Sequence, residues 1–189
     1  MPLDSFIPHP YVRERFETTI RAPAALVLGV ARSFDMQSPP LVRAIIRLRE
    51  RFMGAQGTPR TPRGLVDEML GLGWGLLVDR PGELVIMGAS CQPWLPDVVF
   101  TAVPSAHFRS YAEPDRVKIA WTLEARELDL AVTRFGQETR VVATDGGARI
   151  KFRNYWRWAR FGIVAIRLVL LPEIRKAAER EWRRGGGAR

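Results

Sequence analysis

Three titratable side chains in the sequence could take part in proton transfer or nucleophilic chemistry. Glu138 lies in an alternating segment, where a carboxylate with a shifted pKa could act as a general acid or base. His107 is one of two histidines and Cys91 is the one cysteine. Their spacing does not form a nucleophile–base pair or a set of metal ligands. The sequence therefore predicts no metal site and no cofactor, and it leaves Glu138 and His107 as catalytic candidates.

Glu138 has two interpretations, because Glu138 and Arg140 are two residues apart and share one face of an extended strand. If that face is buried, the two charges must be paired, since burying either one alone is costly. Glu138 is then either an acid in a cavity or part of an ion-pair ladder with Glu124, Arg126 or Arg153. The residue pattern favours the ladder, and the mixed polarity of the neighbouring positions leaves open which face is buried.

Aromatic residues fall mainly on faces that are predicted to point inward. They are Trp94, Phe108, Tyr111, Trp121, Phe135, Tyr155 and Trp156. Such rings either line an apolar pocket, in which a few polar groups orient a ligand, or fill the core solidly. Three arginines, Arg153, Arg157 and Arg167, flank this aromatic end of the last segment, and one of them could bind an acidic headgroup. Arg153 is our candidate for that role.

The segment that must position most of these groups runs from Asp145 to Arg184 and has helical spacing of apolar residues. Asp145 is the predicted N-cap, and Gly185 follows the predicted end. One straight helix of this length would span roughly 60 Å at about 1.5 Å per residue, which is more than a domain of this size can cover. We therefore predict a break at Phe161-Gly162 and a milder kink before Pro172.

The earlier segments predict strands, two helices and a loop. A first strand is predicted over 11–21 and a helix after Pro23. A second helix over 41–52 would place Leu41, Ile45, Leu48 and Phe52 inward. A loop at 54–64, a helical turn at 65–70 and a covering segment at 92–105 are also predicted, with strands at 74–79, 83–91, 106–112, 117–126 and 130–144.

This order predicts an α+β fold. A strongly curved antiparallel sheet would wrap around the long C-terminal helix, with two short helices after the first strand. We assign residues 1–10 to an N-terminal arm, 11–184 to a single domain and 185–189 to a disordered tail.

The positive charge is concentrated in the last predicted helix. Residues 149–184 hold 11 Lys and Arg against 3 Glu, a net charge of +8 out of +9 for the chain. The aromatic residues fall on inward faces rather than among these arginines, which argues against a nucleic-acid partner. An anionic membrane surface stays open as a partner of the basic helix.

No oligomeric state is predicted. The single cysteine and the absence of a signal-like N-terminal stretch indicate a cytoplasmic location.

Several stretches of the sequence form a recognisable series. They are ETTIRAPAALV near the start, then VKIAWTLEAREL, ETRVVATDGGARIKFRNYWRW, a later IR and a closing AERE. Together they resemble the helix-grip superfamily, which includes START domains and polyketide cyclases. The C-terminal stretches are similar to those of an uncharacterised bacterial subgroup of this superfamily. That subgroup implies no particular activity for this chain. The superfamily implies a cavity between sheet and C-terminal helix for a lipid- or polyketide-like molecule.

Two functions follow as expectations. The first is binding of a hydrophobic or amphipathic small molecule in that cavity, with Trp94, Phe108, Trp121, Phe135, Trp156 and Arg153 as ligand-binding residues. The second is a cyclase, aromatase or hydrolase on the same scaffold, which needs a cavity carboxylate such as Glu138, or else His107. Whether the protein is an enzyme is left undecided by the sequence.

Overall fold

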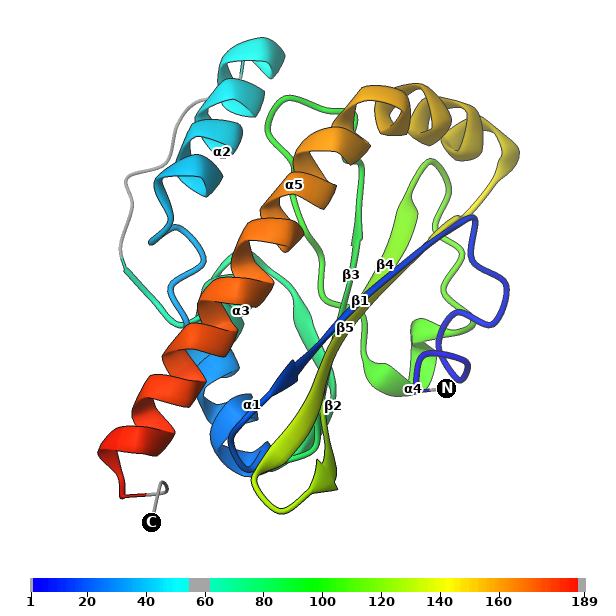
Figure 1. The fold of residues 1–189 in the computed structure, drawn as a ribbon. Coiled ribbons are helices and arrows are strands. Elements are labelled where there is room, and N and C mark those ends of the chain that lie inside the picture. Colours follow the sequence, from blue (N-terminus) through cyan, green and yellow to red (C-terminus); the bar gives the residue numbers. More distant parts are fainter. Residues whose placement is uncertain (1, 55–61, 187–189) are drawn as a thin grey trace.

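The computed structural model describes residues 2–54 and 62–186 and shows an α+β architecture (Figure 1). A five-stranded antiparallel sheet is covered on one face by helices. In chain order the elements are β1 Val12–Ile20, α1 Ala24–Ser33, α2 Pro40–Met53, α3 Leu65–Gly71, β2 Gly75–Arg80, β3 Leu84–Cys91, α4 Ser105–Phe108, β4 Val117–Asp129, β5 Val132–Ala143 and α5 Gly146–Arg184. Most of the predicted 54–64 loop and the end of the predicted tail lie outside the described residues.

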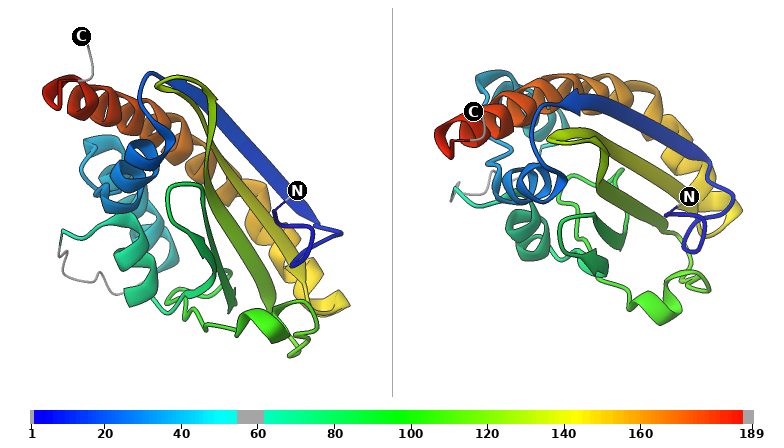
Figure 2. Two further views of the ribbon diagram at one scale, coloured as in Figure 1. Left: turned by 90° about the horizontal axis from the view of Figure 1, so that it is seen from below. Right: turned by 60° about the horizontal axis from the view of Figure 1, so that its bottom comes forward.

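The sheet has the strand order β1-β5-β4-β3-β2, so the first strand pairs with the last one. Its antiparallel registers place residues in rows across neighbouring strands. One row contains Glu14, Thr139, Trp121 and Met87, and its side chains face α5. The next row, with Arg13, Arg140 and Ala120, faces the other way. These two faces are called the inner and the outer face below, and Figure 2 shows α1, α3 and α5 on the inner face.

Helix α5 confirms the prediction of a long C-terminal helix on a curved sheet, but it has no break. Asp145 caps it by accepting a hydrogen bond from the backbone N–H of Ala148 at 2.8 Å. The axis bends after the first turns (Figure 1), and the 39 residues remain one helix with Pro172 inside it. Gly162 serves close packing instead of a break, because a Cβ there would lie 3.1 Å from a methyl group of Ile45.

Helix α2 packs along α5 with a different face from the one predicted. Val42 is its fully buried residue, whereas Leu41, Leu48 and Phe52 are 54%, 55% and 79% exposed. The prediction assumed that the largest apolar side chains would point inward. Ile45, the fourth residue predicted to point inward, does contact α5, at Gly162, whereas the other three are turned toward solvent.

The outer face is covered by the N-terminal residues and by α4. Leu3, Phe6 and Ile7 join Ile86 and Phe108 in one apolar cluster. The predicted strand at 106–112 is wrong, since residues 105–108 form a short helix after Pro104. The strands predicted at 74–79 and 83–91 are joined by a turn between β2 and β3, where Gly82 has a φ of 79°. In the part of the chain that the structure describes, no helix has the length and apolar character needed to cross a bilayer.

Candidate functional site

The interior between the inner face and the helices contains two apolar clusters. The larger one includes Trp121 and Phe135 and packs against α1 and the C-terminal half of α5. The second one includes Cys91, Phe152 and Tyr155, with Trp94 and Trp156 packed against it. Phe100 and Ile119 contact both clusters and join them into one apolar layer. Four of the six predicted ligand-binding residues, Trp94, Trp121, Phe135 and Trp156, therefore belong to this layer.

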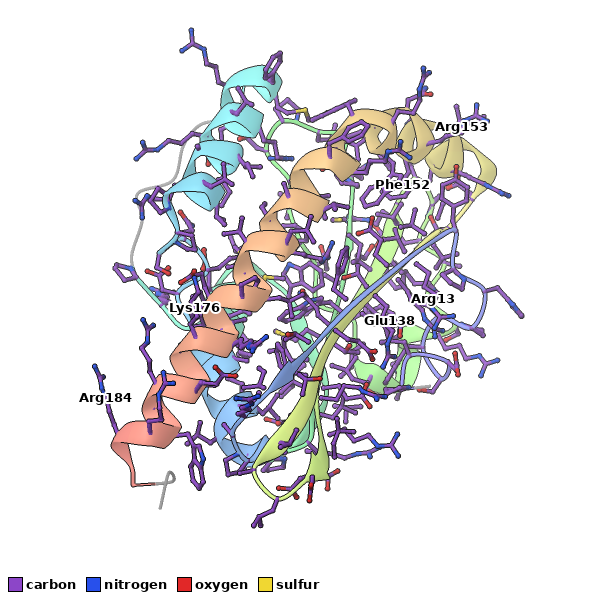
Figure 3. All side chains as sticks on the ribbon, in the orientation of Figure 1. Arg13, Glu138, Phe152, Arg153, Lys176 and Arg184 are labelled. Carbon is purple, nitrogen blue, oxygen red and sulfur yellow. The ribbon has the colours of Figure 1, made fainter. Side chains whose placement is uncertain are left out.

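The other two predicted ligand-binding residues, Phe108 and Arg153, lie elsewhere. Phe108 is buried on the outer face, where its ring meets the ring of Phe6 edge to face at 5.9 Å. It points there because α4 replaces the predicted strand, and because Gly88 leaves room for its ring. Arg153 is exposed on α5, on the side away from Phe152 (Figure 3). Neither residue contributes to the interior.

Glu138 lies on the outer face, as part of an ion-pair network. Its carboxylate accepts hydrogen bonds from Arg140 at 2.7 Å and from Arg13 and Arg15 at 3.0 Å each. Figure 3 shows Arg13 beside Glu138. Burial disfavours the charged form, but the hydrogen bonds and charges of these arginines outweigh it, so the pKa of Glu138 is lowered. This is the ladder interpretation, with Arg13 and Arg15 in place of Arg126 and Arg153.

Neither catalytic candidate reaches the interior. Glu138 is separated from it by the sheet, and His107 is exposed on α4. A general acid must lie within hydrogen-bond reach of the group that it protonates. A reaction in the interior would therefore need groups other than these two.

One polar pair in the interior was missed in the sequence. Arg49 of α2 reaches the hydroxyl of Tyr155 on α5 and lies near the thiol of Cys91. Burial raises the pKa of Tyr155, and the positive charge of Arg49 opposes that rise. Burial likewise raises the pKa of Cys91 to about 12. The sequence did contain a sign that Arg49 points in another direction. Arg43, Arg47 and Arg51 repeat every four residues and so share one side of a helix, and Arg49 falls outside that repeat.

A second polar group bridges the sheet to α5. Arg167 donates to Glu14 of β1 at 2.9 Å and to Thr139 of β5 at 2.7 Å. Burial raises the pKa of Glu14, and the positive charges of Arg167 and Arg160 oppose this rise. Burial lowers the pKa of Arg167. Of the three arginines that were considered for binding an acidic headgroup, Arg167 is thus the one that lies inside. It is paired with the carboxylate of Glu14 instead of a ligand. This bridge fixes α5 on the sheet beside Trp121.

Trp74 carries a buried donor that has no acceptor among the described residues. Its side chain belongs to the larger apolar cluster, beside Phe100, and its indole Nε1 has no hydrogen-bond partner. An unsatisfied buried donor costs about 1–3 kcal/mol, so such groups are uncommon in folded proteins. The layer therefore combines aromatic walls with a free donor at Trp74 and a guanidinium at Arg49.

Two of the hollows on the described surface lie away from the apolar layer, and neither of them is lined by α2 or α5. An open depression of about 330 Å³ lies at the β4–β5 turn between Glu127 and Leu130. A polar hollow of about 40 Å³ lies on the outer face, lined by Arg15, Glu17, Glu124, Arg126, Arg134 and Gly136. Neither of these hollows opens into the apolar layer.

Metal ligands do not gather in this interior or elsewhere in the described residues. No group of three or more His, Cys, Asp or Glu side chains there could hold a metal ion. No protein-family model, curated protein or solved structure matches this chain. The function must therefore be argued from the apolar layer and its polar groups.

Proposed function

We propose that this protein binds an amphipathic small molecule with an acidic headgroup in the apolar layer between the sheet and α5. The observation that carries the proposal is the buried indole donor of Trp74, which has no acceptor among the described residues. A ligand oxygen near it would remove the cost of that unsatisfied group. The proposal assigns no reaction to the protein. The buried cysteine agrees with a cytoplasmic location, which we propose with it.

Aromatic surface supports an apolar ligand body. Trp121 and Phe100 lie in the same cluster as Trp74, and Trp156 adjoins it through Phe100. Small-molecule sites are lined mainly by such side chains, with a few polar groups that fix the orientation of the ligand. A chain or ring system of lipid or polyketide type has the matching chemistry.

Arg49 supports an acidic headgroup. Its guanidinium reaches a neutral phenol, Tyr155, rather than a carboxylate. Arginine binds carboxylates and phosphates through two parallel hydrogen bonds, which are about twice as strong as neutral ones. Arg167 is less suited to this role, because Glu14 already occupies it.

Helix α2 is the part of the cover that can move at the lowest cost. It buries one side chain fully, Val42, and leaves three large apolar residues exposed. The cost of displacing an element grows with the apolar surface that it buries. Displacing α2 would uncover Tyr155 and would carry Arg49 with it.

The test compares an acidic probe with a neutral one. cis-Parinaric acid carries a carboxylate on an apolar chain, and diphenylhexatriene is apolar without a charge. We expect both probes to bind, as measured by the rise in their fluorescence. Arg49→Gln should weaken the binding of cis-parinaric acid by about tenfold or more, because a hydrogen bond to a charged group is worth about 1.5–3 kcal/mol. Binding of diphenylhexatriene should not change.

Arg47→Gln is the matched control, because Arg47 is exposed on the same helix. It should leave the affinity for both probes unchanged. If neither probe binds to the wild-type protein, the proposal is wrong. If Arg49→Gln and Arg47→Gln lose the same affinity for cis-parinaric acid, Arg49 does not bind the headgroup.

A further inference from the structure

Helices α2 and α5 form an exposed apolar surface on the far side of the helices from the sheet. It comprises Leu41, Leu48 and Phe52 of α2 with Trp158, Phe161 and Leu168 of α5, and we call it the α2–α5 surface. The three residues of α5 are 46%, 64% and 60% exposed. Soluble proteins rarely leave so many large apolar side chains together in water without a partner.

Packing between the helices makes this surface continuous. Ile45 touches Gly162, and Arg49 reaches Tyr155, so the two helices run antiparallel in contact. Leu41, Leu48 and Phe52 are seven and four residues apart, which places them on one side of α2. Phe161 and Leu168 are seven apart and lie on one side of α5. Tyr155 also packs edge to face on Trp158, which links the exposed ring to the interior at 5.1 Å.

Cationic side chains surround this apolar surface. Arg157 and Arg160 are exposed before Phe161, and the guanidinium of Arg160 lies over the Phe161 ring at 4.8 Å. Arg175 and Lys176 are exposed after Leu168, and Figure 3 shows Lys176 projecting from α5. α2 adds Arg47 and Arg51, both exposed. Apolar residues flanked by Arg and Lys are typical of helices that lie in the interface of an anionic bilayer.

We propose that the α2–α5 surface docks this protein on anionic lipid bilayers. Phe52, Phe161 and Leu168 enter the headgroup layer, and the surrounding arginines contact lipid phosphates. The positive charge of the surface favours an anionic bilayer over a second copy of the chain. A symmetric dimer would bring the same arginines face to face, where they would repel each other. The exposed leucines decide against nucleic acid, because its bases can stack on rings but offer no apolar layer for Leu41, Leu48 and Leu168. The docking is independent of any ligand in the interior.

The experiment measures co-flotation of the purified chain with lipid vesicles. Vesicles of phosphatidylcholine with one quarter phosphatidylglycerol are compared with vesicles of phosphatidylcholine alone, at 0.1 M NaCl. We expect binding to the anionic vesicles and at least tenfold weaker binding to the neutral ones. Raising the NaCl concentration to 0.5 M should weaken binding to the anionic vesicles severalfold, because salt screens the phosphate contacts.

The double variant Phe161→Ser/Leu168→Ser should bind anionic vesicles at least tenfold more weakly than the wild type. The matched control is Val99→Ser/Leu130→Ser, whose residues are 71% and 93% exposed outside α2 and α5. The control should bind like the wild type. Circular dichroism should show that both variants fold, since all four residues are exposed.

Three results would overturn the docking proposal. The first is equal binding by both double variants, and the second is equal binding of the wild type to neutral and anionic vesicles. The third is a wild-type dimer in sedimentation velocity that Phe161→Ser/Leu168→Ser dissociates, which would make the surface a protein interface. The Arg49→Gln variant keeps the two proposals apart. It should lose affinity for cis-parinaric acid and keep its affinity for vesicles.

Discussion

Glu138 remains charged at neutral pH although it is 3% exposed, because three arginines donate hydrogen bonds to it. Arg140 in turn is held by Asp4 at 2.7 Å and by the carbonyl of Ile7 at 2.8 Å. Buried charges are tolerated when they are paired and fully hydrogen-bonded. The network joins the N-terminal residues to β1 and β5 and stabilises the fold on the face away from the proposed site.

Glu138→Gln should destabilise the protein by about 3 kcal/mol at pH 7, because it leaves buried arginine charge uncompensated. The pKa of Glu138 is lowered in the folded state, so its contribution is complete above the unfolded pKa of about 4.3. That contribution is lost as the pH falls toward the lower folded pKa. Urea unfolding at pH 7 and pH 3 should show the difference between wild type and variant shrinking at pH 3.

Glu17→Gln is the control for this measurement, since Glu17 is an exposed partner of the same Arg15. Exposed ion pairs contribute about 0–1 kcal/mol. A difference for Glu138→Gln that is no larger than the one for Glu17→Gln, or that is equal at both pH values, would contradict the role of the network.

At the same scale, the sequence predicted that Glu138 and Arg140 share a face but not which face. Strand alternation fixes only the relative orientation of side chains. The opposite face of β5 carries Thr133, Gln137 and Thr139, which are polar as well. The arginines that complete the network come from β1, more than a hundred residues earlier, so no local pattern could reveal them. Glu14 and Arg167 are likewise far apart in the sequence, by 153 residues.

At the scale of elements, α2 is the clearest departure from the sequence-based prediction. A helix with large apolar residues on one side is expected to bury that side. Here α2 meets α5 through Ile45, at a position where Gly162 lets the two backbones approach. The strand periods of β1, β4 and β5 were predicted well, because each strand has one face packed on the helices. The strand predicted at 106–112 failed because Pro104 starts a short helix there.

Substitutions in α2 test its orientation. Val42→Ala should cost about 2 kcal/mol, from lost apolar burial plus the cavity left behind. Leu48→Ala should change the free energy of unfolding by less than about 0.5 kcal/mol, since Leu48 is 55% exposed. Thermal or urea unfolding measures both values. A larger cost for Leu48→Ala than for Val42→Ala would show that α2 packs as the sequence pattern suggested.

At the scale of the whole molecule, the N-terminal residues are part of the core rather than a loose arm. Leu3 and Ile7 are 0% and 1% exposed on the outer face. They have no alternating pattern and are interrupted by prolines, so the sequence offered no sign of this packing. The sheet therefore has cover on both faces: α5, α1 and α3 on the inner one, the N-terminal residues and α4 on the outer one.

Ile7→Ala should destabilise the protein by about 3 kcal/mol, as expected for a large side chain removed from a packed cluster. His9→Ala, two residues later at an exposed position, should stay within about 0.5 kcal/mol of the wild type. Urea unfolding curves of the three proteins provide the comparison. Equal stability of Ile7→Ala and the wild type would mean that residues 2–7 do not belong to the folded core.

The pairing of β1 with β5 has a consequence for the order of events during synthesis. Val12 emerges from the ribosome early, whereas its partner Val141 is added about 130 residues later. At about 5–20 residues per second, β1 waits for roughly 6–26 seconds before it can join the sheet. During that time its apolar side and unpaired backbone are available to other chains. The nascent chain thus has a period in which a chaperone bound to β1 would prevent aggregation.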